Sequence, residues 1–225
     1  MELPIFNDNL KSSGSWTSRL ARELDLYREW RNSRTAPPGG TGTYLSTGTD
    51  GERLAEALAS VAGWSTGDGR LDRERLMEVN RILRGGEAPG ELLRVAPPRL
   101  LSELHDPAPA SMLPHLLDLA FDWFTTEGFG ELHPLEQATL VYLRLLDLSP
   151  FAAENDLTAL VAAGFYTSRG GLPVLILSPM ERDEAELKQF THALEAAFRM
   201  LTQPLVEYFA DALIRTMQRE REGTV

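Results

Sequence analysis

The chain of 225 residues contains no cysteine and only two lysines. Without cysteine it can form no disulfide framework, zinc–thiolate site or iron–sulfur cluster, and it has no thiol nucleophile. Basic residues are scarce overall: 22 Lys and Arg stand against 33 Asp and Glu, which gives a formal charge of −11. Broad binding to nucleic acid or to an anionic membrane needs clustered basic side chains, so we expect neither partner.

Long apolar runs are also missing. The longest strongly apolar stretch is Val174–Leu177, whereas a membrane span needs about 18 apolar residues. The N-terminal sequence MELPIF is too short and too acidic for a signal peptide. We therefore expect a cytoplasmic protein.

Several common ligand-binding motifs are absent from the sequence. It has no Walker loop, GxGxxG or HExxH. No histidine lies three or four residues from another, so no helical histidine pair can hold a metal ion. We expect no metal site.

Apolar residues recur mostly with the helical period. The first predicted helix carries Trp16, Leu20, Leu24 and Tyr27 on one face and ends before the breaker cluster at 36–40. Further helices are predicted at 52–62 (stopped by Gly63), 72–84, 111–126, 134–147, 157–166, 182–201 and 204–220. The pattern predicts an all-α protein.

The stretch 85–110 is rich in proline and glycine, which predicts a long irregular connection, and its short run Leu92–Val95 suggests a small β-hairpin. We expect residues 1–69 to form an N-terminal helical region and residues 70–225 to form the main domain.

The most informative stretch begins at His133-Pro134-Leu135 and continues through SPFAAENDLTAL, residues 149–160. It resembles the Fic (Fido) family of nucleotide-dependent transferases, in which HPL opens one helix and a loop HPFx(D/E)GNGRxxR leads into the next. Pro89-Gly90-Glu91 with Arg94 is similar to the family's PGxxR element, which leads into a target-binding flap. The resemblance covers about residues 70–220. It implies a Fic-like helical bundle with a small β-hairpin flap, and descent from enzymes that transfer AMP.

The chain departs from the family motif at most of its chemical positions. Ser149 stands where the family has the histidine that acts as general base, and a missing base costs about 10²–10⁴-fold in rate. Ala153 replaces the acidic metal ligand. The cradle glycines correspond to Glu154 and Asp156, whose carboxylates repel a polyphosphate. The phosphate-holding arginines correspond to Leu157 and Leu160.

Some of the motif remains. Pro150 and Phe151 suit a scaffold role, and Asn155 is retained from the cradle. We expect no confident catalytic residue. The candidate ligand-binding residues are Ser149, Glu154, Asn155, Asp156 and Thr158.

A second similarity lies upstream, where many Fic proteins carry an inhibitory helix with the pattern S/TxxxE followed by G or N. Ser46, Asp50 and Gly51 resemble this pattern with Asp in place of Glu. The alternative is a polar turn that caps the next helix.

Three interpretations follow. The first is a Fic-fold protein that has lost AMP transfer and works as a binding or regulatory module, with no cofactor. The second is a nucleotidyl- or phospho-group transferase of altered chemistry that acts on a protein hydroxyl; ATP and Mg are expected only in that case. The third is a helical domain whose resemblance is coincidental. The first predicts a protein partner, and self-association as a homodimer is a further expectation.

Overall fold

The computed structural model describes residues 15–33, 49–65, 69–86, 93–96, 105–173 and 184–222. Contacts divide the chain into two compact units. We call Met1–Thr43 with Leu175–Val225 the split unit, and Tyr44–Val174 the continuous unit.

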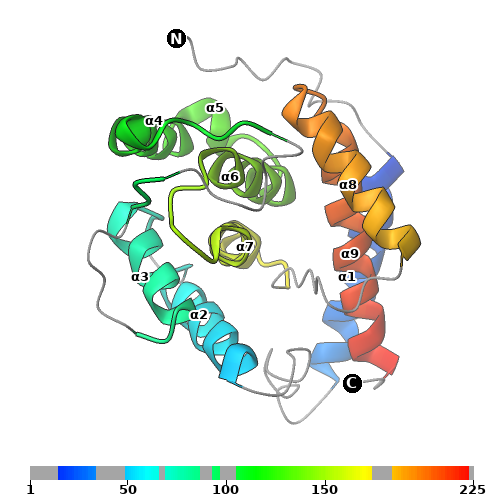
Figure 1. The fold of residues 1–225 in the computed structure, drawn as a ribbon. Coiled ribbons are helices and arrows are strands. Elements are labelled where there is room, and N and C mark those ends of the chain that lie inside the picture. Colours follow the sequence, from blue (N-terminus) through cyan, green and yellow to red (C-terminus); the bar gives the residue numbers. More distant parts are fainter. Residues whose placement is uncertain are drawn as a thin grey trace. The chain divides into compact units, whose positions relative to one another are not determined.

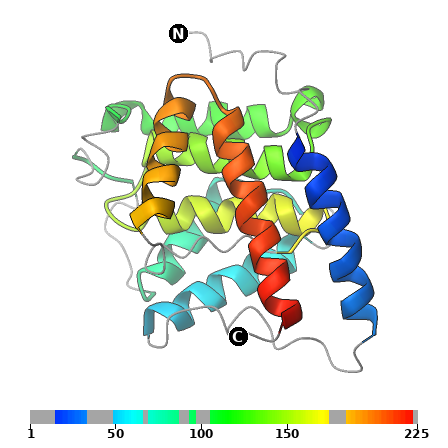
Figure 2. The same ribbon diagram turned by 90° about the vertical axis from the view of Figure 1, so that its right-hand side faces the viewer.

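The split unit contains three described helices, namely α1 (Ser15–Asn32), α8 (Glu184–Phe198) and α9 (Gln203–Glu222). Helix α9 packs against both α1 and α8, as Figure 2 shows for the red, blue and orange helices. Trp16, Leu20 and Tyr27 of α1 are buried, as their spacing predicted. The Tyr27 hydroxyl donates to Glu220 Oε2 at 2.5 Å, which joins α1 to α9.

The described helices of the continuous unit follow one another along the chain. They are α2 (Thr49–Ser65), α3 (Arg73–Leu83), the 3-10 turn η3 (Ala110–Met112), α4 (Leu113–Phe124), α5 (Glu127–Gly130), α6 (Pro134–Leu148) and α7 (Asn155–Arg169).

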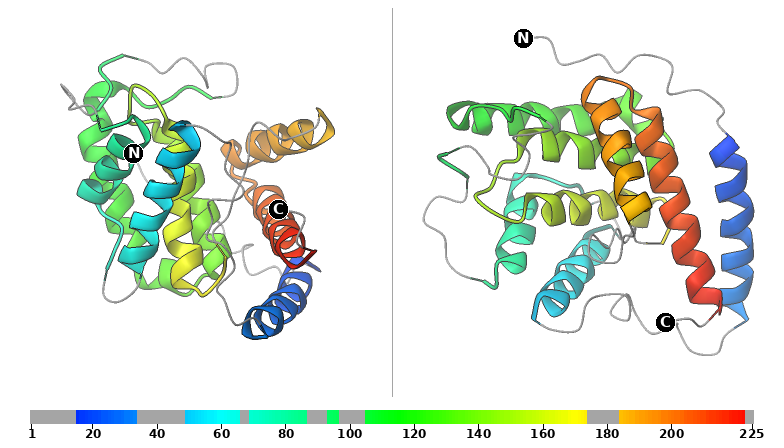
Figure 3. Two further views of the ribbon diagram at one scale, coloured as in Figure 1. Left: turned by 90° about the horizontal axis from the view of Figure 1, so that it is seen from below. Right: turned by 45° about the vertical axis from the view of Figure 1, so that its right-hand side comes forward.

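Helix α7 lies at the centre of this unit, with α6 on one side and α2 and α3 on the other (Figures 1 and 3). Every residue from Thr158 to Thr167 is buried. A helix that is apolar all round is typical of a core position, and this explains why α7 has no polar face in its sequence. Helices α6 and α7, which carry the motif residues, are in more extensive contact than any other pair of described helices.

The all-α prediction is confirmed for the described residues, with corrections at helix ends. Gly63 as a helix stop is wrong, because α2 continues to Ser65. The guanidinium of Arg75 lies 5.4 Å from the centre of the Trp64 ring, a cation–π contact that holds this last turn. The short helix α5 escaped prediction, because four residues give too little periodicity.

The predicted hairpin is not seen in the described segment 93–96. There Leu93 forms an isolated antiparallel bridge with Phe151, so this segment pairs with the loop that follows α6. The remaining residues of that hairpin prediction lie outside the described part of the chain. The domain boundary predicted at residues 69/70 falls between α2 and α3, inside the continuous unit, and stays a prediction.

A search of the described helices finds no segment with both the length and the apolar character needed to cross a bilayer.

Candidate functional site

The candidate site is the loop of residues 149–154 between α6 and α7, which we call the motif loop. It begins at Ser149, which ends α6 in a left-handed conformation with φ 40°. The Ser149 hydroxyl is buried and donates to the carbonyl of Leu146 at 2.6 Å. This side chain therefore caps the helix end and is not presented to solvent as a base or a nucleophile.

Arg94 holds the start of the motif loop. Its Nε donates to the carbonyl of Ser149 at 2.6 Å, and its Nη2 donates to Leu148 at 3.2 Å and to Ala108 at 2.5 Å. Its Nη1 donates to the carbonyl of Ala96 at 3.3 Å. Burial lowers the pKa of Arg94, yet an arginine stays charged at neutral pH. The carbonyl-rich C-terminus of α6 favours that positive charge.

Asn155 closes the middle of the loop. Its Oδ1 accepts from the backbone N–H of Phe151 at 2.8 Å, and its Nδ2 donates to the carbonyl of the same residue at 2.8 Å. The Phe151 side chain is fully buried, and Pro150 is buried beside it. The amide predicted to touch a ligand is thus directed at the loop's own backbone.

Asn80 of α3 ties the end of the loop to α7. Its Nδ2 donates to the carbonyl of Ala153 and to the hydroxyl of Thr158, each at 3.0 Å. Thr158 is buried, so its hydroxyl serves this contact. Sequence reasoning missed Asn80, although a polar residue beside the apolar positions Leu76 and Val79 was an available signal.

The solvent-facing side of the loop consists of Ala152, Ala153 and Glu154, with Asp156 beyond them on the first turn of α7. Glu154 adopts a left-handed conformation with φ 59° and makes no side-chain cap. Asp156 Oδ1 accepts from the hydroxyl of Tyr142 at 2.5 Å. The N-terminus of a helix attracts anions, and here Asp156 itself supplies the negative charge.

The predicted phosphate-holding positions carry no cation. Leu160 is 4% exposed and belongs to the core, and Leu157 is half-buried. Among the described residues, no group of three His, Asp or Glu side chains could hold a metal ion. The exposed part of the motif loop and the first turn of α7 thus offer two carboxylates, Glu154 and Asp156, and no basic side chain.

The inhibitory-like residues are only partly described. Ser46 lies outside the described residues, and Gly51 is buried in the first turn of α2. The Asp50 side chain is 88% exposed, and its Oδ1 lies 3.7 Å from Nη1 of Arg53 on the same helix. The inhibitory interpretation stays a prediction.

The start of α6 is fixed by His133 and Glu136. His133 Nδ1 accepts from the N–H of Leu135 at 3.2 Å, while Glu136 Oε2 accepts from the N–H of His133 at 3.0 Å. Burial lowers the pKa of His133 and raises the pKa of Glu136. The conspicuous HPL sequence thus forms a helix cap in this structure.

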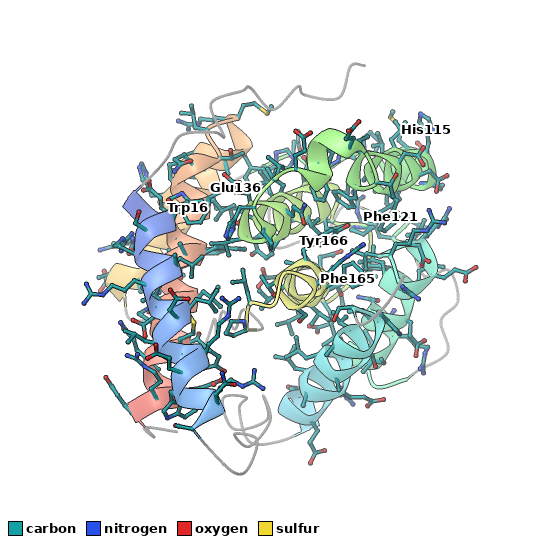
Figure 4. The ribbon with its side chains drawn as sticks, turned by 180° about the vertical axis from the view of Figure 1, so that it is seen from behind. Trp16, His115, Phe121, Glu136, Phe165 and Tyr166 are labelled. Carbon is teal, nitrogen blue, oxygen red and sulfur yellow. The ribbon has the colours of Figure 1, made fainter. Side chains whose placement is uncertain are left out.

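Aromatic rings pack α7 against α4 and α5. Tyr166 lies 5.4 Å from Phe129 and 6.3 Å from Phe124 between ring centres. Figure 4 shows Tyr166 on the side of α7 that faces α6, toward Phe121 of α4. Burial raises the pKa of Tyr166, so its phenol stays protonated. This cluster therefore anchors the C-terminal half of α7, at the opposite end of that helix from the motif loop.

Comparison with known proteins points to one family. No protein-family model matches the chain. A protein adenylyltransferase Fic from Drosophila willistoni is 26% identical over 113 residues, which is 50% of this chain and 22% of that relative. The matched segment therefore spans about a fifth of that relative's length.

Solved structures share the fold. A Fic-domain-containing signalling protein from Bacteroides thetaiotaomicron aligns over 96% of this chain and 94% of its own, with a TM-score of 0.64 and 18% identity. An IbpAFic2 variant in complex with adenylylated Cdc42 aligns over 94% of this chain and 74% of its own, with a TM-score of 0.57 and 17% identity. The chain is thus similar in sequence to Fic adenylyltransferases over half its length, and it shares the fold of solved Fic-domain structures.

Proposed function

We propose that this chain is a Fic-fold pseudoenzyme, inactive in AMP transfer, that works as a binding or regulatory module. The main support is that the polar side chains of the motif are hydrogen-bonded to nearby backbone. Ser149 bonds to the carbonyl of Leu146, and Asn155 bonds to the backbone of Phe151. A polyphosphate at this loop would meet two side chains already bonded to the backbone and would approach the carboxylates of Glu154 and Asp156. Each carboxylate–phosphate contact at about 4 Å costs roughly 4 kcal/mol at an effective dielectric of about 20.

The motif also lacks the side chains that AMP transfer needs, namely a general base and a metal ligand. A general base must reach the proton that it removes, and the Ser149 hydroxyl is buried and engaged. A metal that bridges phosphates needs ligands, and the Ala153 side chain has no ligand atom. The scaffold around these positions remains well packed, which supports a role that uses the fold without the reaction.

A protein is the partner that we propose. The IbpAFic2 structure holds adenylylated Cdc42, so this fold can present a surface to another protein. In the proposed module that surface is used for binding alone.

Label transfer tests the proposal. The chain is incubated with Mg²⁺ and ATP labelled on the α-phosphate, alone and with Cdc42, beside an active Fic adenylyltransferase as positive control. We expect no label on either protein. Label that appears with this chain and disappears in Asn155→Ala would contradict the proposal and favour a transferase of altered chemistry.

A further inference from the structure

A groove of about 410 Å³ lies in the continuous unit, and two of its lining residues, Leu93 and Arg94, also contact the motif loop. It runs between the first half of α3, the segment 93–95 and the start of α4. Its walls include Arg73, Met77, Leu93, Arg94, Val95 and Pro114. Pockets of about 300–1,000 Å³ are large enough to enclose ligand side chains.

An exposed apolar side chain lines this groove: Val95 is 77% exposed. Met112, which is 38% exposed, lies in sequence between the lining residues Ala110 and Pro114. They are the two large apolar side chains exposed in the described residues of the continuous unit. Apolar atoms left in water beside a groove are typical of an interaction site, because an incoming apolar group removes both surfaces from water.

The groove also carries positive charge in a strongly acidic chain. Arg73 opens α3, where the helix dipole disfavours a cation. Its Nη1 lies 3.7 Å from Asp118 Oδ1, too long for a hydrogen bond, and that aspartate is 62% exposed. Arg94 is 5% exposed, and its described partners are all carbonyls. An incoming carboxylate could therefore pair with the guanidinium of Arg73 and would also be attracted by the positive charge of buried Arg94.

We propose that this groove binds a segment of a partner protein in which an apolar side chain stands next to a carboxylate. The apolar side chain lies against Met77, Leu93 and Val95, and the carboxylate pairs with Arg73. The inference rests on the proposed function as a binding module, for which it names the surface and the chemistry of the partner.

Selection from a phage library of random peptides tests the proposal on the full chain. We expect enrichment of peptides that carry Asp or Glu beside a large apolar residue. Fluorescence polarisation then measures the affinity of a selected peptide. We expect Arg73→Glu and Val95→Asp each to weaken it by about tenfold or more. Arg22→Glu makes the same charge reversal, and Leu187→Asp the corresponding apolar-to-acidic change, at exposed positions of the split unit. Both are expected to leave the affinity for the peptide unchanged.

Two results would overturn the proposal: selection without an acidic and apolar motif, or a selected peptide that binds Arg73→Glu as tightly as the original chain. Circular dichroism of each variant shows that it is folded. The label-transfer assay on the same preparation separates this inference from the proposed function. Transfer would contradict the pseudoenzyme proposal, whereas failed peptide selection without transfer would overturn the groove alone.

Discussion

At the scale of single residues, Glu154 occupies a backbone conformation that suits glycine. Its φ of 59° lies in the left-handed region, which costs an L-residue about 1–2 kcal/mol. The side chain makes no capping bond that would offset this cost. The loop backbone therefore keeps a shape that favours glycine at a position where this sequence has glutamate.

Replacing Glu154 by glycine is expected to stabilise the fold. We expect Glu154→Gly to raise the free energy of unfolding by about 1 kcal/mol, because glycine adopts this conformation without steric strain. Glu154→Ala, which also removes the carboxylate but keeps Cβ, is the matched control and should give a smaller gain. Urea denaturation compares the two. Equal stabilities of Glu154→Gly and Glu154→Ala would show that the left-handed backbone at residue 154 is not strained.

Arg94 is the residue on which the start of the motif loop depends. We expect Arg94→Met to lower the free energy of unfolding by about 3 kcal/mol or more, because buried carbonyls lose charged hydrogen-bond donors. Arg94→Lys should recover little of this, since one ammonium cannot reproduce the planar guanidinium fork. Arg22→Met, at an exposed site, should change stability by less than about 0.5 kcal/mol. An Arg94→Met chain as stable as Arg22→Met would contradict this account.

At the scale of elements, the cap of α6 gives the fold a pH dependence. Burial lowers the pKa of His133 in the folded chain, so the unfolded chain binds its proton more readily. The contribution of neutral His133 to the free energy of unfolding is complete above the pKa of the unfolded chain, about 6.5. It is lost as the pH falls from there through the lower pKa of the folded chain. Glu136 acts in the opposite sense, because its raised pKa favours the folded state at acidic pH.

His133→Asn isolates this effect. Asparagine also caps a helix but does not titrate, and Glu136 is present in both chains, so its contribution cancels in the difference. We expect the variant to gain stability relative to the original chain as pH is lowered from 7.5 to 5.5. Urea denaturation at the two pH values measures the difference. A difference that stays constant with pH would contradict the assigned role of His133.

The elements also show how far the sequence alone could lead. The helices were predictable because apolar side chains recur with their period and because Asp72, His133 and the glycine pair at 85–86 mark their ends. The bond network of the motif loop was not predictable. Arg94 and Asn80 lie far from the loop in sequence, and their partners are mainly backbone carbonyls, which carry no sequence signal.

At the scale of the whole molecule, the charge of −11 argues against broad polyanion binding but does not describe any one surface. Glu154 on the motif loop and Asp156 on the first turn of α7 are acidic, while Arg73 lines the groove between α3 and α4. The same chain thus presents negative charge at one place and a cation at another. Our account assigns binding to the second place and inactivity to the first.

Calorimetric titration of the full chain with ATP, with and without Mg²⁺, tests the central claim most directly. The account predicts no saturable heat, under conditions in which an active Fic adenylyltransferase binds. ATP binding in the micromolar range that is lost in Asn155→Ala would contradict it, because the motif loop would then be a working nucleotide site.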